Sequence, residues 1–155
     1  IRPHPQTSIS EKEMLLKLQE ELKSYTDIEW DFERENIISM QKADIMISDF
    51  SGIIFDYMFL FSRPVIYTSY NFDKRPYDCS DLEEEPFKFQ CIQKLGIKLT
   101  EKDFSDIKNI ILQNIENLEL KEKIVEAKNT AWMNQGNAGV NCVDALLKIK
   151  EELKN

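Results

Sequence analysis

Short runs of consecutive apolar residues mark the interior strands that we predict for this chain. Residues 45–47 and 64–67 are apolar without alternation, and polar residues bound each run. A strand of a parallel sheet is buried on both faces and has this uninterrupted pattern. We therefore predict two buried strands, at 44–49 and 64–68, and a further short strand at 27–31.

Helical spacing of apolar residues fills the segments between these strands. In 10–24 such residues recur three or four positions apart, which is typical of an amphipathic helix. Ser10, followed three residues later by Glu13, predicts a capping box at its start. Residues 36–43 predict a shorter helix. Residues 51–61 are apolar nearly all round, which predicts a helix in the core.

The second half of the chain begins with a long polar and aromatic stretch, 69–86. Ordered loops of this length often carry function, so its tyrosines either close over a base or sugar or pack on the surface. Residues 87–95 fit a helix or a short strand. The sequence predicts three further helices, at 100–117, 120–134 and 137–153.

Strands and helices therefore alternate with short connections. This order predicts an α/β fold in which a Rossmann-like parallel sheet is flanked by helices, with extra helices at the C-terminal end. The 155 residues suffice for one domain with a substantial core, so 1–155 is expected to be a single domain. The chain begins at Ile1 as though leaving a strand, which we interpret as a fragment of a longer protein.

Charge and composition exclude some partners. The net charge of -8 makes free nucleic acid or an anionic bilayer an unfavourable partner for the domain as a whole. A local phosphate site is still compatible, because helix-end N–H groups carry no net charge. No apolar run approaches the roughly 20 residues that span a bilayer. The single histidine, His4, excludes a multi-histidine metal site, and we interpret the acidic run 81–85 as a solvated loop.

The first candidate for chemistry lies where a predicted strand gives way to a predicted helix. Asp49, Ser51 and Gly52 occupy this junction. Ligands of open α/β sheets bind beyond the carboxyl ends of strands, and the first N–H groups of a helix attract anions. Ser51 adds a hydroxyl donor and Gly52 allows close backbone approach. The alternative is an ordinary helix cap formed by Asp49 or Ser51.

A second candidate lies at the start of the chain, also at a predicted strand end. Arg2 could pair with a phosphate through two hydrogen bonds, and His4 could bind phosphate or act as an acid or base. The alternative is a solvated loop. Asp56 is a third candidate, because an aspartate in so apolar a helix is expected to cap it, to pair with a cation such as Arg63, or to orient the site.

These segments together resemble the CDP-glycerol glycerophosphotransferase family, the teichoic-acid polymerases and primases of bacterial cell walls and related capsule enzymes. The resemblance rests on Arg2-Pro3-His4-Pro5, on residues 43–57 (ADIMISDFSGIIFDY) and on the strand after Arg63-Pro64, in this order. Gly52 stands where the family usually has a second serine. Residues 135–138 are similar to a late segment of the family.

The resemblance implies a two-domain transferase of the GT-B type, with this chain as its C-terminal, donor-binding domain. Carried over by position, Arg2 and His4 contact donor phosphates as catalytic residues, and Ser51 with the Gly52 amide binds the pyrophosphate. Asp49 holds the turn, and Asp56 matches an acidic position of the same motif. The implied substrate is CDP-glycerol or another nucleotide-linked donor, and no cofactor or metal is implied.

The implied function is transfer of glycerol phosphate, or another polyol phosphate, from a CDP-linked donor to a cell-wall or capsule polymer. A polymer or lipid-linked acceptor would bind to an N-terminal half outside this chain. The implied location is the cytoplasm, and any peripheral attachment at the inner face of the membrane is expected outside this segment. Two alternatives remain open: a nucleotide-sugar glycosyltransferase or epimerase of the same fold, and a non-enzymatic α/β interaction domain.

Overall fold

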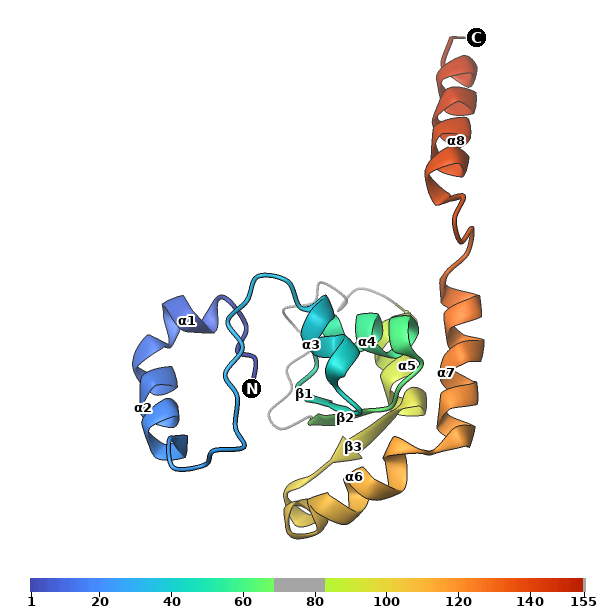
Figure 1. Cartoon of the computed structure of the whole chain (residues 1–155). Coiled ribbons are helices and arrows are strands. Elements are labelled where there is room, and N and C mark those ends of the chain that lie inside the picture. Colours follow the sequence, from blue (N-terminus) through green and yellow to red (C-terminus); the bar gives the residue numbers. More distant parts are fainter. Residues whose placement is uncertain (69–82, 155) are drawn as a thin grey trace. The chain divides into compact units, whose positions relative to one another are not determined.

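The computed structural model describes residues 1–68 and 83–154, which form two compact units. One unit spans Ile1–Ala43 and the other begins at Asp44. Figure 1 shows their helices and strands coloured along the chain.

The first unit combines short helices with irregular segments. It contains α1 (Thr7–Ser10), α2 (Lys12–Leu22) and α3 (Ile37–Lys42). The prediction of a strand at 27–31 is wrong. The Asp31 N–H donates to the Ile1 carbonyl at 2.8 Å, and the Ile1 amino group donates to the Glu29 carbonyl. A β-strand forms hydrogen bonds with several successive residues of its partner strand. Here both of these hydrogen bonds come from the single residue Ile1.

The capping box predicted at Ser10 and Glu13 is also wrong. Ser10 is the last residue of α1, and its hydroxyl donates to the Gln6 carbonyl at 3.0 Å. Glu11 precedes α2, and no side-chain hydrogen bond caps that helix. The short helix α1 thus incorporates Ser10, and the amphipathic helix begins only after it.

The second unit is built on a three-stranded parallel sheet with the order β1-β2-β3. The strands β1 (Met46–Ser48) and β2 (Val65–Thr68) confirm two predicted strands, and the α/β class is confirmed with them. The third strand, β3 (Gly96–Leu99), was not predicted. Its glycine and lysine interrupt the apolar pattern that identified the other two. Because all three strands run parallel, their carboxyl ends meet at one edge of the sheet.

Burial differs between the two predicted strands. Val65, Ile66 and Tyr67 of β2 are buried, as the sequence predicted. In β1, however, Ile47 is 50% exposed, so the prediction of a strand buried on both faces is wrong there. Among the described strands, β1 lies at one end of the sheet and pairs only with β2, so it has fewer neighbours than the central strand.

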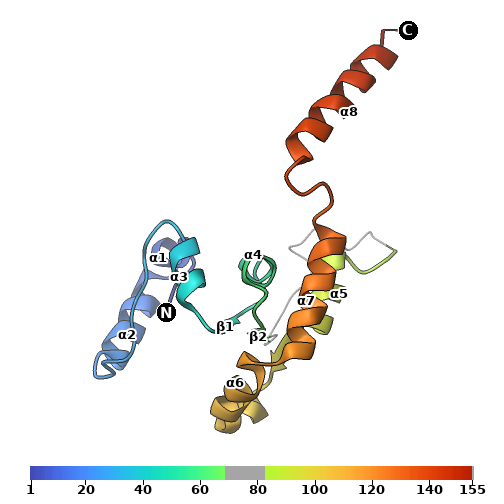
Figure 2. The ribbon, with the colours of Figure 1, turned by 45° about the vertical axis from the view of Figure 1, so that its right-hand side comes forward.

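Three helices pack together beside this sheet. Helices α4 (Ile53–Phe61) and α5 (Phe87–Leu95) connect the strands, and α7 (Leu118–Ala131) packs against both. Figure 2 shows α7 running alongside α5. Both connections proceed in the same direction across the sheet, so right-handed crossovers place α4 and α5 on the same face. The most buried side chains of these helices are Ile54, Tyr57, Met58, Phe89, Ile92 and Ile124.

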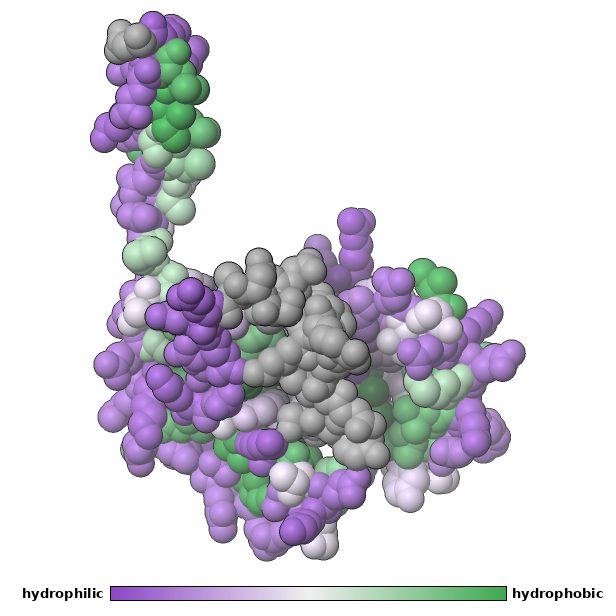
Figure 3. All heavy atoms as spheres, turned by 180° about the vertical axis from the view of Figure 1, so that it is seen from behind, coloured by the Kyte–Doolittle hydropathy of each residue, from purple (hydrophilic) through white to green (hydrophobic). Residues whose placement is uncertain are grey.

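Three further elements follow β3 along the chain. They are the 3₁₀ helix η2 (Glu101–Asp106) with α6 (Ile107–Ile115), which replace the single helix predicted at 100–117, and α8 (Ala138–Glu152). No residue of α8 is buried, and Figure 3 shows its apolar side chains gathered along one side. None of the described helices is long and apolar enough to cross a membrane.

Candidate functional site

The turn between β1 and α4 contains two backbone amides without an acceptor in the described part of the chain. The Ile54 N–H donates to the Ser51 carbonyl at 3.2 Å, and the Phe55 N–H donates to the Gly52 carbonyl at 3.1 Å. Among the described residues, neither the Gly52 amide nor the Ile53 amide has an acceptor. Free N–H groups and the helix dipole together favour an anion at such a helix start.

Asp49 and Ser51 shape this turn through short-range contacts. The Ser51 N–H donates to the Asp49 carbonyl at 3.0 Å, and the exposed Asp49 carboxylate accepts from the Ser48 hydroxyl at 3.4 Å. Within the described residues no side-chain hydrogen bond caps α4, so neither Asp49 nor Ser51 forms the ordinary cap considered from the sequence. The half-buried Ser51 hydroxyl has no partner in the described part of the chain and is available to a ligand.

Gly52 and Phe50 occupy very different surroundings within the same turn. A Cβ added to Gly52 would meet nothing within 4 Å, and its φ of -58° is accessible to every residue type. The neighbouring Phe50 stacks on Phe89 of α5, with ring centroids 4.9 Å apart. The turn is thus anchored by its aromatic residue, while the glycine contributes an exposed backbone.

Asp56 does not form the ion pair that was considered for it. It lies in the first turn of α4 and is exposed, so its carboxylate remains hydrated. Arg63 instead hydrogen-bonds to Tyr57 and lies over the Phe61 ring, 5.7 Å from its centroid. Burial raises the pKa of Tyr57, and the bond to Arg63 opposes that shift. Asp56 lies about one helical turn after the Gly52 and Ile53 amides.

In the first unit, Arg2 is held by an aspartate that sequence reasoning missed. One Arg2 nitrogen lies 2.6 Å from Oδ2 of Asp31, and another donates to the Glu33 carbonyl. The hydroxyl of Ser39 and the Glu33 N–H also donate to Asp31, the latter at 2.9 Å. These hydrogen bonds, led by that of Ser39, lower the pKa of Asp31 to about 2. A guanidinium has five donors, so Arg2 is oriented and keeps donors for a ligand.

His4 is exposed and has one ring nitrogen engaged. Its Nδ1 accepts from the Gln6 N–H at 3.2 Å. In the neutral ring this places the proton on Nε2, which then points a donor at solvent or at a ligand. The histidine can thus donate to a phosphate oxygen while a backbone contact restrains its ring.

Two cavities were not foreseen from the sequence. One, of about 610 Å³, lies within the first unit and is lined by Arg2, Asp31, Ser39 and Lys42. The other, of about 770 Å³, opens at the carboxyl ends of β2 and β3 beside Phe104. The first cavity depends on residues nearly thirty positions apart, and the second depends on β3, which was not predicted. A local sequence pattern does not reveal either arrangement. The candidates in the 69–82 part of the long loop lie outside the described residues.

The family model described as CDP-Glycerol:Poly(glycerophosphate) glycerophosphotransferase matches residues 1–88. This stretch is more than half of the chain and contains both Arg2-Pro3-His4-Pro5 and the turn at 49–52. The chain belongs to this family. The resemblance identified in the sequence is thereby confirmed, and membership indicates a glycerophosphotransferase-type activity with a nucleotide-linked donor.

The glycerophosphotransferase match ends shortly after α5 begins, so β3 and all later elements lie beyond it. No curated protein and no solved structure matches the chain. Roles for individual residues of this glycerophosphotransferase-family protein therefore rest on their own geometry. The turn at 49–52 has the strongest geometry, because two amides and one hydroxyl there have no partner among residues 1–68 and 83–154.

Proposed function

We propose that this protein transfers glycerol phosphate, or another polyol phosphate, from a CDP-linked donor to a growing wall or capsule polymer. The observation that carries the proposal is the start of α4, where the Gly52 and Ile53 amides and the Ser51 hydroxyl lack described partners. A pyrophosphate supplies the oxygen acceptors that these three donors need. Membership in the family supports the reaction type.

In the proposed reaction, an acceptor hydroxyl oxygen attacks the β-phosphorus of the donor. The bond from that phosphorus to the bridging oxygen breaks, CMP leaves with the bridging oxygen, and the hydroxyl proton passes to a base or to solvent. Negative charge grows on the leaving phosphate, so fixed donors accelerate the step by stabilising it; removing one such donor typically costs about 10²–10³-fold in rate. We assign this role to Ser51 and the two amides.

We assign Arg2 and His4 to donor phosphates as well, each from its own geometry. Asp31 orients the Arg2 guanidinium before any ligand arrives. His4 offers its Nε2–H as a donor to a phosphate oxygen. We assign Asp49 to shaping the turn. We assign Asp56, in the first turn of α4, to orienting the site.

The proposal extends to the architecture and location of the whole enzyme. We propose that this chain, residues 1–155, acts as one donor-binding domain of a GT-B transferase whose other half binds the acceptor. The proposed location is the cytoplasm, with any attachment to the inner face of the membrane made by other segments. A longer sequence with a second α/β half before Ile1 would support this arrangement.

Calorimetric titration with CDP-glycerol tests the function. We expect the chain to bind CDP-glycerol, and Ser51→Ala to weaken binding by about 10- to 100-fold, because hydrogen bonds to charged groups contribute about 1.5–3 kcal/mol. Ser10→Ala is the matched control, since it also removes a serine hydroxyl, one that donates to the Gln6 carbonyl. Its affinity should equal that of the original chain.

Other results would contradict the proposal. Tight binding of a UDP- or GDP-linked sugar without binding of CDP-glycerol would favour a nucleotide-sugar glycosyltransferase or epimerase. Absence of binding to every nucleotide-linked donor would favour a non-enzymatic interaction domain. An unchanged affinity in Ser51→Ala would remove this residue from the site.

A further inference from the structure

The cavity at the carboxyl ends of β2 and β3 has a definite chemical character. It measures about 770 Å³, and the ends of the two strands, Thr68 and Leu99, form part of its wall. Lys98 and Lys102 supply ammonium groups, and Phe104 supplies an aromatic ring. Most of the wall area of this cavity is apolar even though several lining residues are polar, and an apolar wall with placed polar groups is typical of small-molecule sites.

Phe104 is presented to this cavity by a fixed turn. It lies in η2, which begins with a capping box: the Thr100 hydroxyl and N–H donate to Oδ2 of Asp103 at 2.6 and 2.8 Å. These bonds also lower the pKa of Asp103. The Phe104 side chain is nevertheless 57% exposed. A large, mostly exposed aromatic ring carried on a hydrogen-bonded turn is suited to stacking with a flat ligand.

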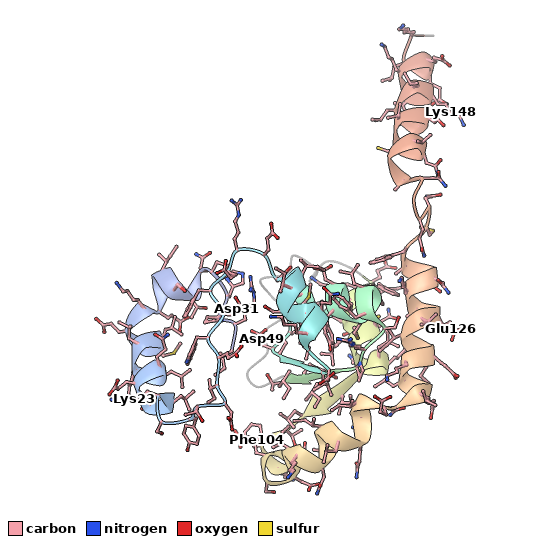
Figure 4. The ribbon with its side chains drawn as sticks, in the orientation of Figure 1. Lys23, Asp31, Asp49, Phe104, Glu126 and Lys148 are labelled. Carbon is pink, nitrogen blue, oxygen red and sulfur yellow. The ribbon has the colours of Figure 1, made fainter. Side chains whose placement is uncertain are left out.

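The cavity and the phosphate turn lie along the same edge of the sheet. Ser48, which leads into the turn, pairs with Tyr67, and the following Thr68 pairs with Leu99. Neighbouring strands are about 4.8 Å apart, so two strand spacings separate the turn from the end of β3 by about 10 Å. Figure 4 shows Asp49 and Phe104 at this edge. A nucleoside extending from a pyrophosphate at the turn covers a distance of this order.

We propose that this cavity binds the nucleobase of the nucleotide-linked donor, with the base stacked on Phe104 and its oxygen and nitrogen acceptors facing Lys98 or Lys102. The inference rests on the proposed function, because it takes the pyrophosphate to lie at the turn. It goes beyond family membership, since the matched residues 1–88 stop before β3 and η2.

The charges around the cavity favour a base over a phosphate. Glu101 lines the cavity together with the two lysines and offsets part of their positive charge. A phosphate chain of the polymer would need the lysines and would leave the aromatic ring without a partner. A base uses both the ring and the donors, because its face is aromatic and its edge carries acceptors.

Titration of the full chain with CDP and, separately, with inorganic pyrophosphate tests this assignment. We expect Phe104→Ala to weaken CDP binding by about 5- to 100-fold, the range that alanine substitution of base-stacking aromatics produces. Pyrophosphate binding should be unchanged. Phe104→Tyr keeps the ring and should bind CDP as the original chain does. Leu112→Ala is the control, because Leu112 is 61% exposed on α6 and does not line the cavity.

The outcomes separate this inference from the proposed function. If Phe104→Ala binds CDP normally, the base lies elsewhere while the proposed function stands. If it weakens pyrophosphate as much as CDP, the cavity acts on phosphate and the base assignment is overturned. If the original chain binds neither ligand, both proposals fail. Circular dichroism of each variant shows whether the fold is retained.

Discussion

The side chains of Arg2 and Ser51 are positioned for a ligand by different contacts. The Arg2 guanidinium is held by Asp31 and by the Glu33 carbonyl, so part of its side-chain freedom is already lost before binding. Ser51 takes its position from the turn, and its hydroxyl is free among the described residues. Orienting a flexible side chain in advance lowers the entropic cost of binding, which matters most for a long side chain such as arginine.

Two glycines of the second unit show how local space decides the effect of a substitution. A Cβ on Gly96 would lie 2.8 Å from Cδ1 of both Tyr67 and Ile92, and 3.0 Å from the Ile92 carbonyl oxygen. A Cβ on Gly52 would meet nothing within 4 Å. Gly96 is therefore needed for close packing, whereas Gly52 is not needed for its backbone conformation.

We expect Gly96→Ala to lower the free energy of unfolding by about 1–3 kcal/mol through overpacking. Gly52→Ser should leave it unchanged or raise it by a few tenths of a kcal/mol, because serine is at least as good as glycine at a helix N-cap. Urea unfolding monitored by circular dichroism measures both. Equal losses in the two variants would contradict the packing argument.

At the level of elements, α8 differs from α4 and α7 in how much it buries. It contains no buried residue, whereas α7 buries Ile124 and α4 buries four side chains. Its apolar side is formed by residues such as Val143, Leu146 and Leu147, each more than half exposed. A helix without tertiary packing has only its own hydrogen bonds and propensity to stabilise it.

Amide hydrogen exchange should therefore be fastest, among these three helices, in α8. Local opening of an unpacked helix costs little free energy, while amides of the core exchange only through larger openings. Mass spectrometry of peptides from α4, α7 and α8 on the full chain compares them directly. Protection of α8 equal to that of α7 would show that its apolar side is covered in solution, for example by a second copy of the chain.

At the scale of the whole molecule, both compact units contain carboxylates whose pKa lies below its usual range. In the first unit, hydrogen bonds from Ser39, Glu33 and Arg2 lower the pKa of Asp31 to about 2. In the second, bonds within the chain lower the pKa of Asp103 and of Glu119, which pairs with Lys123. A group with a lowered pKa in the folded protein binds protons more weakly than in the unfolded chain.

The contribution of these carboxylates to the free energy of unfolding should accordingly be fully present above about pH 4–5. It should decrease as the pH falls toward about 2, where Asp31 is protonated in the folded protein as well. Urea midpoints measured across this range test the expectation. Asp31→Asn should be less stable at neutral pH and should show a smaller loss between about pH 4 and about pH 2. An unchanged loss in that variant would exclude Asp31 as a contributor.

The sequence by itself determined features that depend on local order. Uninterrupted apolar runs identified β1, β2 and α4, because burial on several sides requires apolar residues at successive positions. Their alternation predicted the parallel sheet, and the motif order from Arg2 to Pro64 identified the family. The sequence also located the turn at 49–52, because residues adjacent in the chain determine where a strand ends and the next helix begins.

Only the tertiary structure decided which of these local possibilities were realised. Ser10 has the spacing of a helix cap but is the last residue of α1. Ile47 has the pattern of a buried residue but lies on a strand with one described neighbour. The pairing of Arg2 with Asp31 and the position of Phe104 at the edge of the sheet depend on residues far apart in sequence. Such contacts are set by how elements pack, and packing brings together residues that no short pattern connects.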